Sequence, residues 1–141
     1  MAYEGYMLVF FGYTYCPDVC PTELQVMAAA LDSMGAKADL IQPVFVSVDP
    51  ERDTPEMMAN YIQVFHPNII GLTGTPERLL AVFDAYGIVA EKEPIAESAI
   101  GYVMNHTTRV FLVDQEGKLA LSYSFGTPPE DIAQDIEHLL K

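Results

Sequence analysis

Hydrophobic residues along the chain fall into two alternating patterns, short continuous runs and stripes with helical spacing. The first run, residues 6–13 (YMLVFFGY), carries no charge, which predicts a strand buried on both faces. A helical stripe follows and ends at Gly35, a residue suited to close a helix. The stripe consists of Leu24, Met27, Ala28, Leu31 and Met34.

The rest of the chain repeats this alternation. Strands are predicted at residues 41–48, 69–72, 109–114 and 118–125, the last two forming a hairpin around the turn at 115–117. Helices are predicted at residues 57–65, from Pro76 to Gly87, and from Pro128 to the end of the chain. Capping boxes are expected between Asp53 and Glu56 and between Thr127 and Glu130, and residues 91–101 are expected to form an exposed loop.

This order of elements predicts one α/β domain covering residues 1–141. A βαβ half is joined to a ββα half around a central mixed sheet flanked by helices, which is a thioredoxin-like order. Ligands of such open sheets gather at the carboxyl ends of the parallel strands. The loop after the first strand and the loop beginning at Asp49 both leave strands at that edge, so we expect the functional site there.

Charge narrows the choice of partners. The chain has 20 acidic and 7 basic residues and a formal net charge of -13, which repels phosphate backbones and anionic membrane surfaces. Nucleic acid is therefore excluded as a partner. The longest hydrophobic run is too short to cross a bilayer, so any membrane contact is expected to need an anchor outside this chain.

The candidate chemistry begins with the two cysteines of the chain, Cys16 and Cys20, each followed by a proline. Proline favours an extended backbone in the residue before it, and Pro21 is suited to the first position of a helix. Cys20 is then expected at the helix N-cap, where the helix dipole favours a thiolate. The alternatives are two inert buried thiols or a structural disulfide, but the setting favours a reactive or ligating pair.

Three histidines could complete such a site. His138 and His66 lie at helix ends, where solvation or capping explains them. His106 follows the long loop and precedes a strand, and ligation and simple solvation are equally compatible with that position. Two thiolates and an imidazole suit copper or zinc, and a three-ligand set fits copper better because structural zinc normally takes four ligands. Metal binding and thiol exchange are the two remaining interpretations.

Four motifs in order, FFGYTYCPDVCPTEL, FVSVDPERDTPE, LTGTPE and YVMNHT, resemble the Sco/SenC family of copper-binding assembly proteins for cytochrome c oxidase. The resemblance implies a thioredoxin-like fold and one copper ion, Cu(I) or Cu(II), held by Cys16, Cys20 and His106. It also implies that the chain is a copper chaperone that loads the dinuclear copper site of cytochrome c oxidase subunit II. A copper donor or a thiol reductant protein is an implied further partner. The competing function is a thiol–disulfide reductase that uses Cys16 and Cys20 to keep the copper-ligand cysteines of the target reduced.

The resemblance also implies a compartment, the bacterial periplasm or the mitochondrial intermembrane space, with a membrane tether in the full-length protein. By this resemblance the N-terminal β-hairpin of the family is expected to be missing from this chain, and an exposed strand edge beside residues 6–13 would then allow a homodimer. Asn105 stands where the family usually has Asp, which removes a carboxylate beside His106 and is expected to weaken Cu(II) binding. Tyr15 replaces a frequent His without changing the ligand set. Asp49 is expected either to add polarity around the metal or to cap its loop.

Overall fold

The structure is a computed structural model that describes residues 5–15, 19–94, 102–106 and 108–140. In chain order its elements are β1 (Tyr6–Gly12), α1 (Val19–Met34), the 3-10 helix η1 (Gly35–Leu40), β2 (Ile41–Ser47), α2 (Pro55–Ile62), β3 (Ile70–Leu72), α3 (Pro76–Tyr86), β4 (Ala90–Pro94), β5 (Tyr102–His106), β6 (Val110–Val113), β7 (Leu119–Tyr123) and α4 (Pro129–Leu139). Strands and helices alternate as the sequence predicts.

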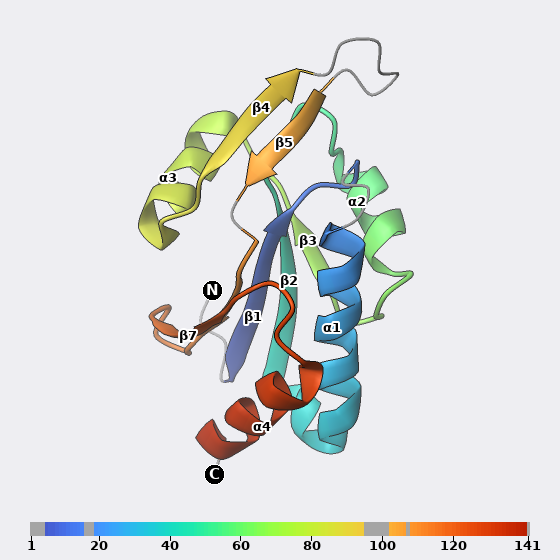
Figure 1. Ribbon diagram of the computed structural model, residues 1–141, viewed down its shortest axis with the longest axis vertical. Helices are drawn as coiled ribbons and strands as arrows, with labels where there is room; N and C mark the ends of the chain where they lie inside the picture. Colours follow the sequence, from blue (N-terminus) through green and yellow to red (C-terminus); the bar gives the residue numbers. More distant parts are fainter. Residues whose placement is uncertain (1–4, 16–18, 95–101, 107, 141) are drawn as a thin grey trace.

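Within the described residues, five strands form one mixed sheet in the order β3-β2-β1-β6-β7 (Figure 1). Strands β1, β2 and β3 are parallel, whereas β6 runs antiparallel to β1 and β7 antiparallel to β6. Helices α1, α2 and α4 lie on one side of this sheet and α3 on the other. The predicted α/β fold, a mixed sheet flanked by helices, is therefore confirmed.

Strand β1 is the central strand, and residues 8–12 of it are buried. Leu8, Phe10 and Phe11 are completely buried, because β2 and β6 pair with β1 on its two edges and helices cover both of its faces. Phe10 lies against Phe45 of β2, while Phe11 faces the other way, toward Phe83 of α3. The prediction from the uncharged run is confirmed, and the homodimer predicted from a nearby strand edge stays a prediction.

The segment expected to be an exposed loop contains most of one strand of a separate two-stranded ribbon. Strands β4 and β5 pair antiparallel, with Ala90 opposite His106 and Glu91 opposite Asn105. Figure 1 shows this ribbon beyond the carboxyl end of β1, next to α3. The prediction of a loop over residues 91–101 was wrong for residues 91–94, and His106 is the last residue of a strand instead of the end of a loop.

Neither predicted capping box forms. Thr54 caps α2, since its side chain accepts a hydrogen bond from the N–H of Met57, and Asp53 bonds elsewhere. Residue Pro128 precedes α4 without a side-chain cap, and the Thr127 hydroxyl donates to the carbonyl of Ser124. In both cases proline at the first helical position fits the helix start, because it needs no N–H partner there.

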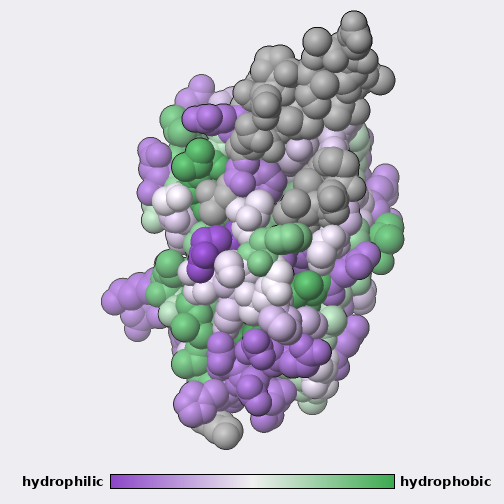
Figure 2. Space-filling view, in the orientation of Figure 1, coloured by the Kyte–Doolittle hydropathy of each residue, from purple (hydrophilic) through white to green (hydrophobic). Residues whose placement is uncertain are grey.

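The outer surface is mixed. Figure 2 shows hydrophobic surface on the side where α3 lies, and the exposed hydrophobic residues of that helix are Leu80 and Val82. Hydrophilic residues cover the end of the molecule where α4 lies. In the part of the chain that the structure describes, no helix has the length and apolar character needed to span a bilayer.

A buried carboxylate links α1 to the loop before α4. The side chain of Glu23 is only 1% exposed, and its Oε1 accepts a hydrogen bond from the N–H of Gly126 at 3.2 Å. Burial raises the pKa of Glu23 above its ordinary value of 4.5, and the bond from Gly126 opposes this effect only in part. The native state therefore holds the Glu23 proton more tightly than the unfolded chain does.

The contribution of Glu23 to stability consequently depends on pH. It is fully present below the ordinary pKa of 4.5 and is lost as the pH rises through the raised pKa. Glu23→Gln stays neutral at every pH and keeps an oxygen that can accept from Gly126. We expect the variant to lose less stability than the parent between about pH 4 and about pH 8 in urea denaturation. Parallel stability profiles for parent and variant would contradict this assignment.

Candidate metal centre

Two of the three predicted ligand residues meet at the carboxyl edge of the parallel strands. Cys20 lies in the first turn of α1 and His106 ends β5, and the Cys20 Sγ is 3.7 Å from the His106 Nε2 although 86 residues separate them. Cys20 is completely buried and His106 is half-buried. Cys16 lies outside the described residues, so its position relative to this pair stays a prediction.

The helix begins earlier than the sequence predicts. Val19 is the first residue of α1, so Cys20 is inside the first turn and not at the N-cap expected from Pro21. The consequence for the thiol is similar, because the positive end of the helix dipole acts over the whole first turn. The dipole favours the thiolate, which is the form that binds metals and attacks disulfides.

The separation between sulfur and nitrogen fits two ligands of one metal ion. With metal–ligand bonds of about 2.3 Å to sulfur and about 2.0 Å to nitrogen, a gap of 3.7 Å corresponds to a ligand–metal–ligand angle of about 119°. That angle is close to trigonal geometry. The separation of the two donor atoms therefore fits a soft or borderline cation such as copper.

Gly12, the last residue of β1, makes room for the sulfur. A Cβ at this position would lie 2.7 Å from the Cys20 Sγ and 2.8 Å from the Cε2 of Phe45. Both distances are shorter than van der Waals contact, so only glycine allows the strand to approach α1 this closely. The Gly12 carbonyl also accepts the N–H of Val48 at 2.8 Å, which joins the end of β1 to the end of β2.

Aromatic rings surround the imidazole. The ring of Tyr13 lies edge-on to His106 at a centroid distance of 5.6 Å and an interplanar angle of 85°. Phe10 makes a second edge contact at 6.3 Å. Since Tyr13 is only 2% exposed and Phe10 is completely buried, these rings restrict the orientations that the imidazole can take.

Asp49 belongs to a pair with Arg52. The Arg52 Nε donates to the Asp49 carboxylate at 2.5 Å, and the Asp49 N–H donates to the hydroxyl of Ser47 at 3.0 Å. The Arg52 guanidinium lies 4.4 Å from the ring centroid of Tyr15 and 5.8 Å from that of Tyr13. Asp49 is thus connected to the His106 side of the site through Arg52 and Tyr13.

Two further predictions concern Asn105, next to His106, and His66, at the end of a helix. The backbone of Asn105 lies in β5 opposite Glu91, but its side chain is outside what the structure describes, so its effect on His106 stays a prediction. His66 makes local contacts near the end of α2, where its Nδ1 accepts from the Asn68 N–H and its Nε2 lies 3.4 Å from an Asp32 oxygen. Its place is therefore away from the candidate centre.

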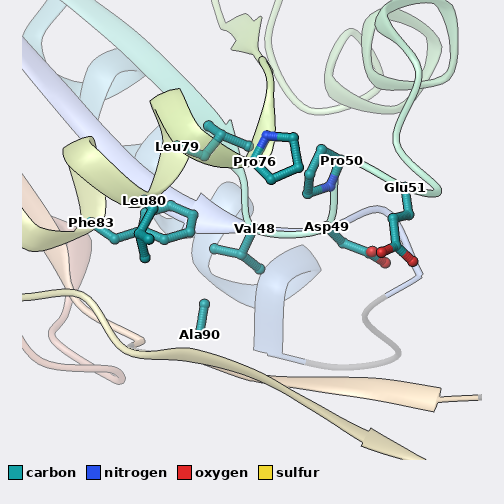
Figure 3. Close-up of a pocket in the computed structure, with 9 residues that line it drawn as sticks. All are labelled: Val48, Asp49, Pro50, Glu51, Pro76, Leu79, Leu80, Phe83 and Ala90. Carbon is teal, nitrogen blue, oxygen red and sulfur yellow. The ribbon is translucent and has the colours of Figure 1, made fainter.

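A groove beside the candidate metal centre is lined mostly by hydrophobic residues (Figure 3). It encloses about 260 Å³ between α3, the loop after β2 and β4. Its lining consists of Val48, Asp49, Pro50, Glu51, Pro76, Leu79, Leu80, Phe83 and Ala90. Because this set contains neither a thiol nor an imidazole, the groove is not the metal centre. Among the described residues no group of three or more Cys, His, Asp or Glu side chains converges on a metal position, and the role of Cys16 as a third ligand stays a prediction.

Sequence reasoning missed the residues that shape the centre, namely Gly12, Tyr13, Arg52 and Asp53. Gly12 breaks an otherwise continuous hydrophobic run, and that was the available signal for a close backbone approach. The other three follow from contacts between segments far apart in the sequence, which no local pattern displays.

The fold and the thiol–imidazole pair define the class of this protein, a thioredoxin-like protein with a cysteine and a histidine at the carboxyl edge of its parallel strands. The SCO1/SenC family model matches residues 2–141, so the chain belongs to the SCO1/SenC family. This confirms the family to which the four motifs point.

Individual relatives and solved structures support this family assignment. The chain is 35% identical over 133 residues to Protein SCO2 homolog, mitochondrial, of Bos taurus, covering 93% of this chain and 50% of that protein. The chain therefore spans about half the length of that relative. The structure of Bradyrhizobium japonicum ScoI with copper bound is similar with a TM-score of 0.87 and 39% identity, covering 97% of this chain and 86% of that one. The crystal structure of Arabidopsis thaliana ScoI with copper bound has a TM-score of 0.89 and 32% identity, with coverages of 99% and 86%.

The close approach at Gly12 leads to a prediction. In Gly12→Ala the new methyl group must displace the Cys20 sulfur or the Phe45 ring, and we expect a loss of about 1–3 kcal/mol in unfolding free energy from overpacking. Thiol alkylation of the metal-free protein should also become faster, because the sulfur is pushed out of its buried position. Urea denaturation and alkylation kinetics measure the two effects.

Gly74→Ala is the matched control, since a Cβ there meets its nearest neighbour only at 3.9 Å. It should leave both the stability and the alkylation rate close to those of the parent. A Gly12→Ala variant that matched the Gly74→Ala variant in both measurements would show that the tight contact is not a constraint.

Proposed function

We propose that this chain binds one copper ion through Cys16, Cys20 and His106 and delivers it to, or prepares, the dinuclear copper site of cytochrome c oxidase subunit II. The observation that carries the proposal is the 3.7 Å contact between the Cys20 Sγ and the His106 Nε2 in a buried setting. Cys16 is four positions before Cys20 in the sequence, a spacing that lets it add the third ligand. The copper-bound ScoI structures of similar fold support the choice of metal.

The chain's own groups would tune the site as follows. The first turn of α1 favours the Cys20 thiolate, and the rings of Tyr13 and Phe10 hold the imidazole of His106 near the sulfur. Copper is here a cargo, and the sulfur and nitrogen donors suit both of its common oxidation states. A site built from two elements, the α1 side and the ribbon, can hold the ion firmly and still release it when one element moves.

Membership of the family suggests the cellular compartment and the partner proteins of this chain. The bovine relative is a mitochondrial protein by name, which supports the intermembrane space or, in a bacterium, the periplasm. We propose that a membrane tether in the full-length protein keeps the domain near the oxidase, and that a copper donor or thiol reductant protein acts before delivery. The domain would work as one unit over residues 1–141.

A thiol–disulfide reductase is the second candidate function. The position of Cys20 in the first turn of α1 favours it, because the same thiolate stabilisation that aids metal binding aids thiol exchange. Cys16 and Cys20 would then be the exchanging pair and His106 would have no necessary role.

His106→Ala separates the two functions. The variant keeps two thiolates, which can still hold Cu(I), but Cu(II) prefers more ligands with nitrogen among them. We expect Cu(II) affinity to fall by at least about a hundredfold and Cu(I) affinity by much less. The rate of exchange with a small disulfide should remain within a few-fold of the parent, since it depends on thiolate fraction and access. Competitive titrations with each ion and exchange kinetics provide the measurements.

His138→Ala is the matched control, because His138 lies in the last turn of α4, away from the centre. It should change none of the three quantities. If oxidase assembly in cells survived His106→Ala while Cu(II) binding was lost, the copper-delivery function would be refuted and the reductase function supported.

A further inference from the structure

Asp53 is a buried carboxylate whose partners all lie at the carboxyl ends of two strands. Its side chain is 1% exposed. One oxygen accepts the Thr14 hydroxyl at 2.6 Å, the other accepts the Ser47 hydroxyl at 2.7 Å, and the Thr14 N–H lies 3.3 and 3.2 Å from the two oxygens. Thr14 and Asp53 are 39 residues apart in the sequence. Burying a carboxylate is unfavourable unless donors surround it, and here three donors do.

Helix capping does not account for this carboxylate, because Thr54 supplies the cap of α2. Asp53 instead binds the residue that immediately precedes Tyr15 and the cysteine loop. Both the backbone N–H and the side chain of Thr14 are held, so both the position and the direction of the chain at Thr14 are fixed.

Thr14 is the link between the two sides of the candidate centre. The residue before it, Tyr13, presents its ring to the imidazole of His106. The residue after it, Tyr15, has the guanidinium of Arg52 over its ring at 4.4 Å. Neighbouring residues of one loop, Arg52 and Asp53, therefore contact three consecutive residues that lead from the His106 contact to the first cysteine.

We propose that Asp53 is a positioning residue for the metal centre: by binding Thr14 it fixes residues 13–15, so that the Tyr13 ring holds the imidazole of His106 beside the Cys20 sulfur. The proposal rests on the proposed function for the identity of the ligands. It goes beyond that function by assigning a role to a residue that touches neither the thiol nor the imidazole in the contacts described above.

The proposal has a consequence specific to this architecture. Cys20 is held by α1 and by the close approach of Gly12, whereas His106 comes from the β4–β5 ribbon and rests against Tyr13. Loosening residues 13–15 would free the imidazole to move relative to the Cys20 sulfur, while α1 would keep that sulfur in place. Binding of Cu(II), which uses all three ligands, should therefore weaken more than binding of Cu(I), which two thiolates can hold.

Thr14→Val tests this with a small change, because it removes the hydroxyl bond and keeps the backbone N–H. We expect Cu(II) affinity to fall roughly tenfold to a hundredfold and Cu(I) affinity by no more than about threefold, the range seen when support of a metal ligand is lost. Thr14→Ser keeps the hydroxyl and should restore both affinities. Asp53→Asn should act in the same direction, and the double variant should be no weaker than Asp53→Asn alone.

Thr75→Val is the matched control. It also removes one threonine hydroxyl bond, the cap to the Arg78 N–H at 3.3 Å, but at the start of α3. It should leave the ratio of Cu(II) to Cu(I) affinity unchanged. If Thr14→Val and Thr75→Val lowered both affinities equally, Asp53 would have a merely structural role and the proposal would be overturned.

A metal-free measurement separates failure of this proposal from failure of the proposed function. In the reduced apoprotein we expect Thr14→Val and Asp53→Asn to raise the alkylation rate of the two thiols several-fold, with Thr14→Ser and Thr75→Val near the parent rate. Unchanged alkylation in both of the first two variants would refute the positioning role whether or not copper binds. A parent protein that bound no copper, with alkylation changed as expected, would refute the copper function and support the positioning of residues 13–15 by Asp53.

Discussion

The close approach between α1 and the end of β1 is the constraint on which the candidate centre depends. Gly12 carries no side chain, so the Cys20 sulfur can occupy the space where a Cβ would otherwise lie. The carbonyl of the same residue accepts the Val48 N–H and holds the end of β2 beside β1. One position in the chain therefore fixes both the place of the thiol and the start of the loop that surrounds it. Any larger residue would disturb the two together.

Parallel pairing of β1 and β2 then decides which polar groups can meet. Both strands end at the same edge of the sheet, so Thr14 after β1 comes within hydrogen-bond distance of Asp53 in the loop after β2. The buried network from Thr14 through Asp53 to Ser47 is satisfied by internal donors, which makes it rigid as well as stable. His106 arrives from the ribbon and finds a surface already formed by Tyr13 and the Cys20 sulfur.

The sequence predicted those features that local patterns encode. The uncharged run of β1 indicated a central strand, and the helical stripe of α1 indicated a buried face, on which Leu24, Met27 and Leu31 are all at most 2% exposed. The β4–β5 ribbon was missed because it lies outside the central sheet, and segment 91–94 (EKEP) shows no alternation of hydrophobic and polar residues. The role of Asp53 was misassigned because an acid before a helix looks the same whether it caps that helix or binds a strand end 39 residues away.

The burial of Cys20 bears on the choice between the two candidate functions. Thiol exchange needs an in-line approach to sulfur, and a completely buried sulfur beneath Gly12 and Phe45 gives a substrate disulfide no such path. A metal ion is far smaller than a disulfide-bonded chain and requires only the side of the sulfur that faces His106. Exchange would therefore have to begin at Cys16, with Cys20 as the resolving thiol. In that order the contact between Cys20 and His106 would act on the resolving thiol alone, whereas metal binding would use both atoms of the pair.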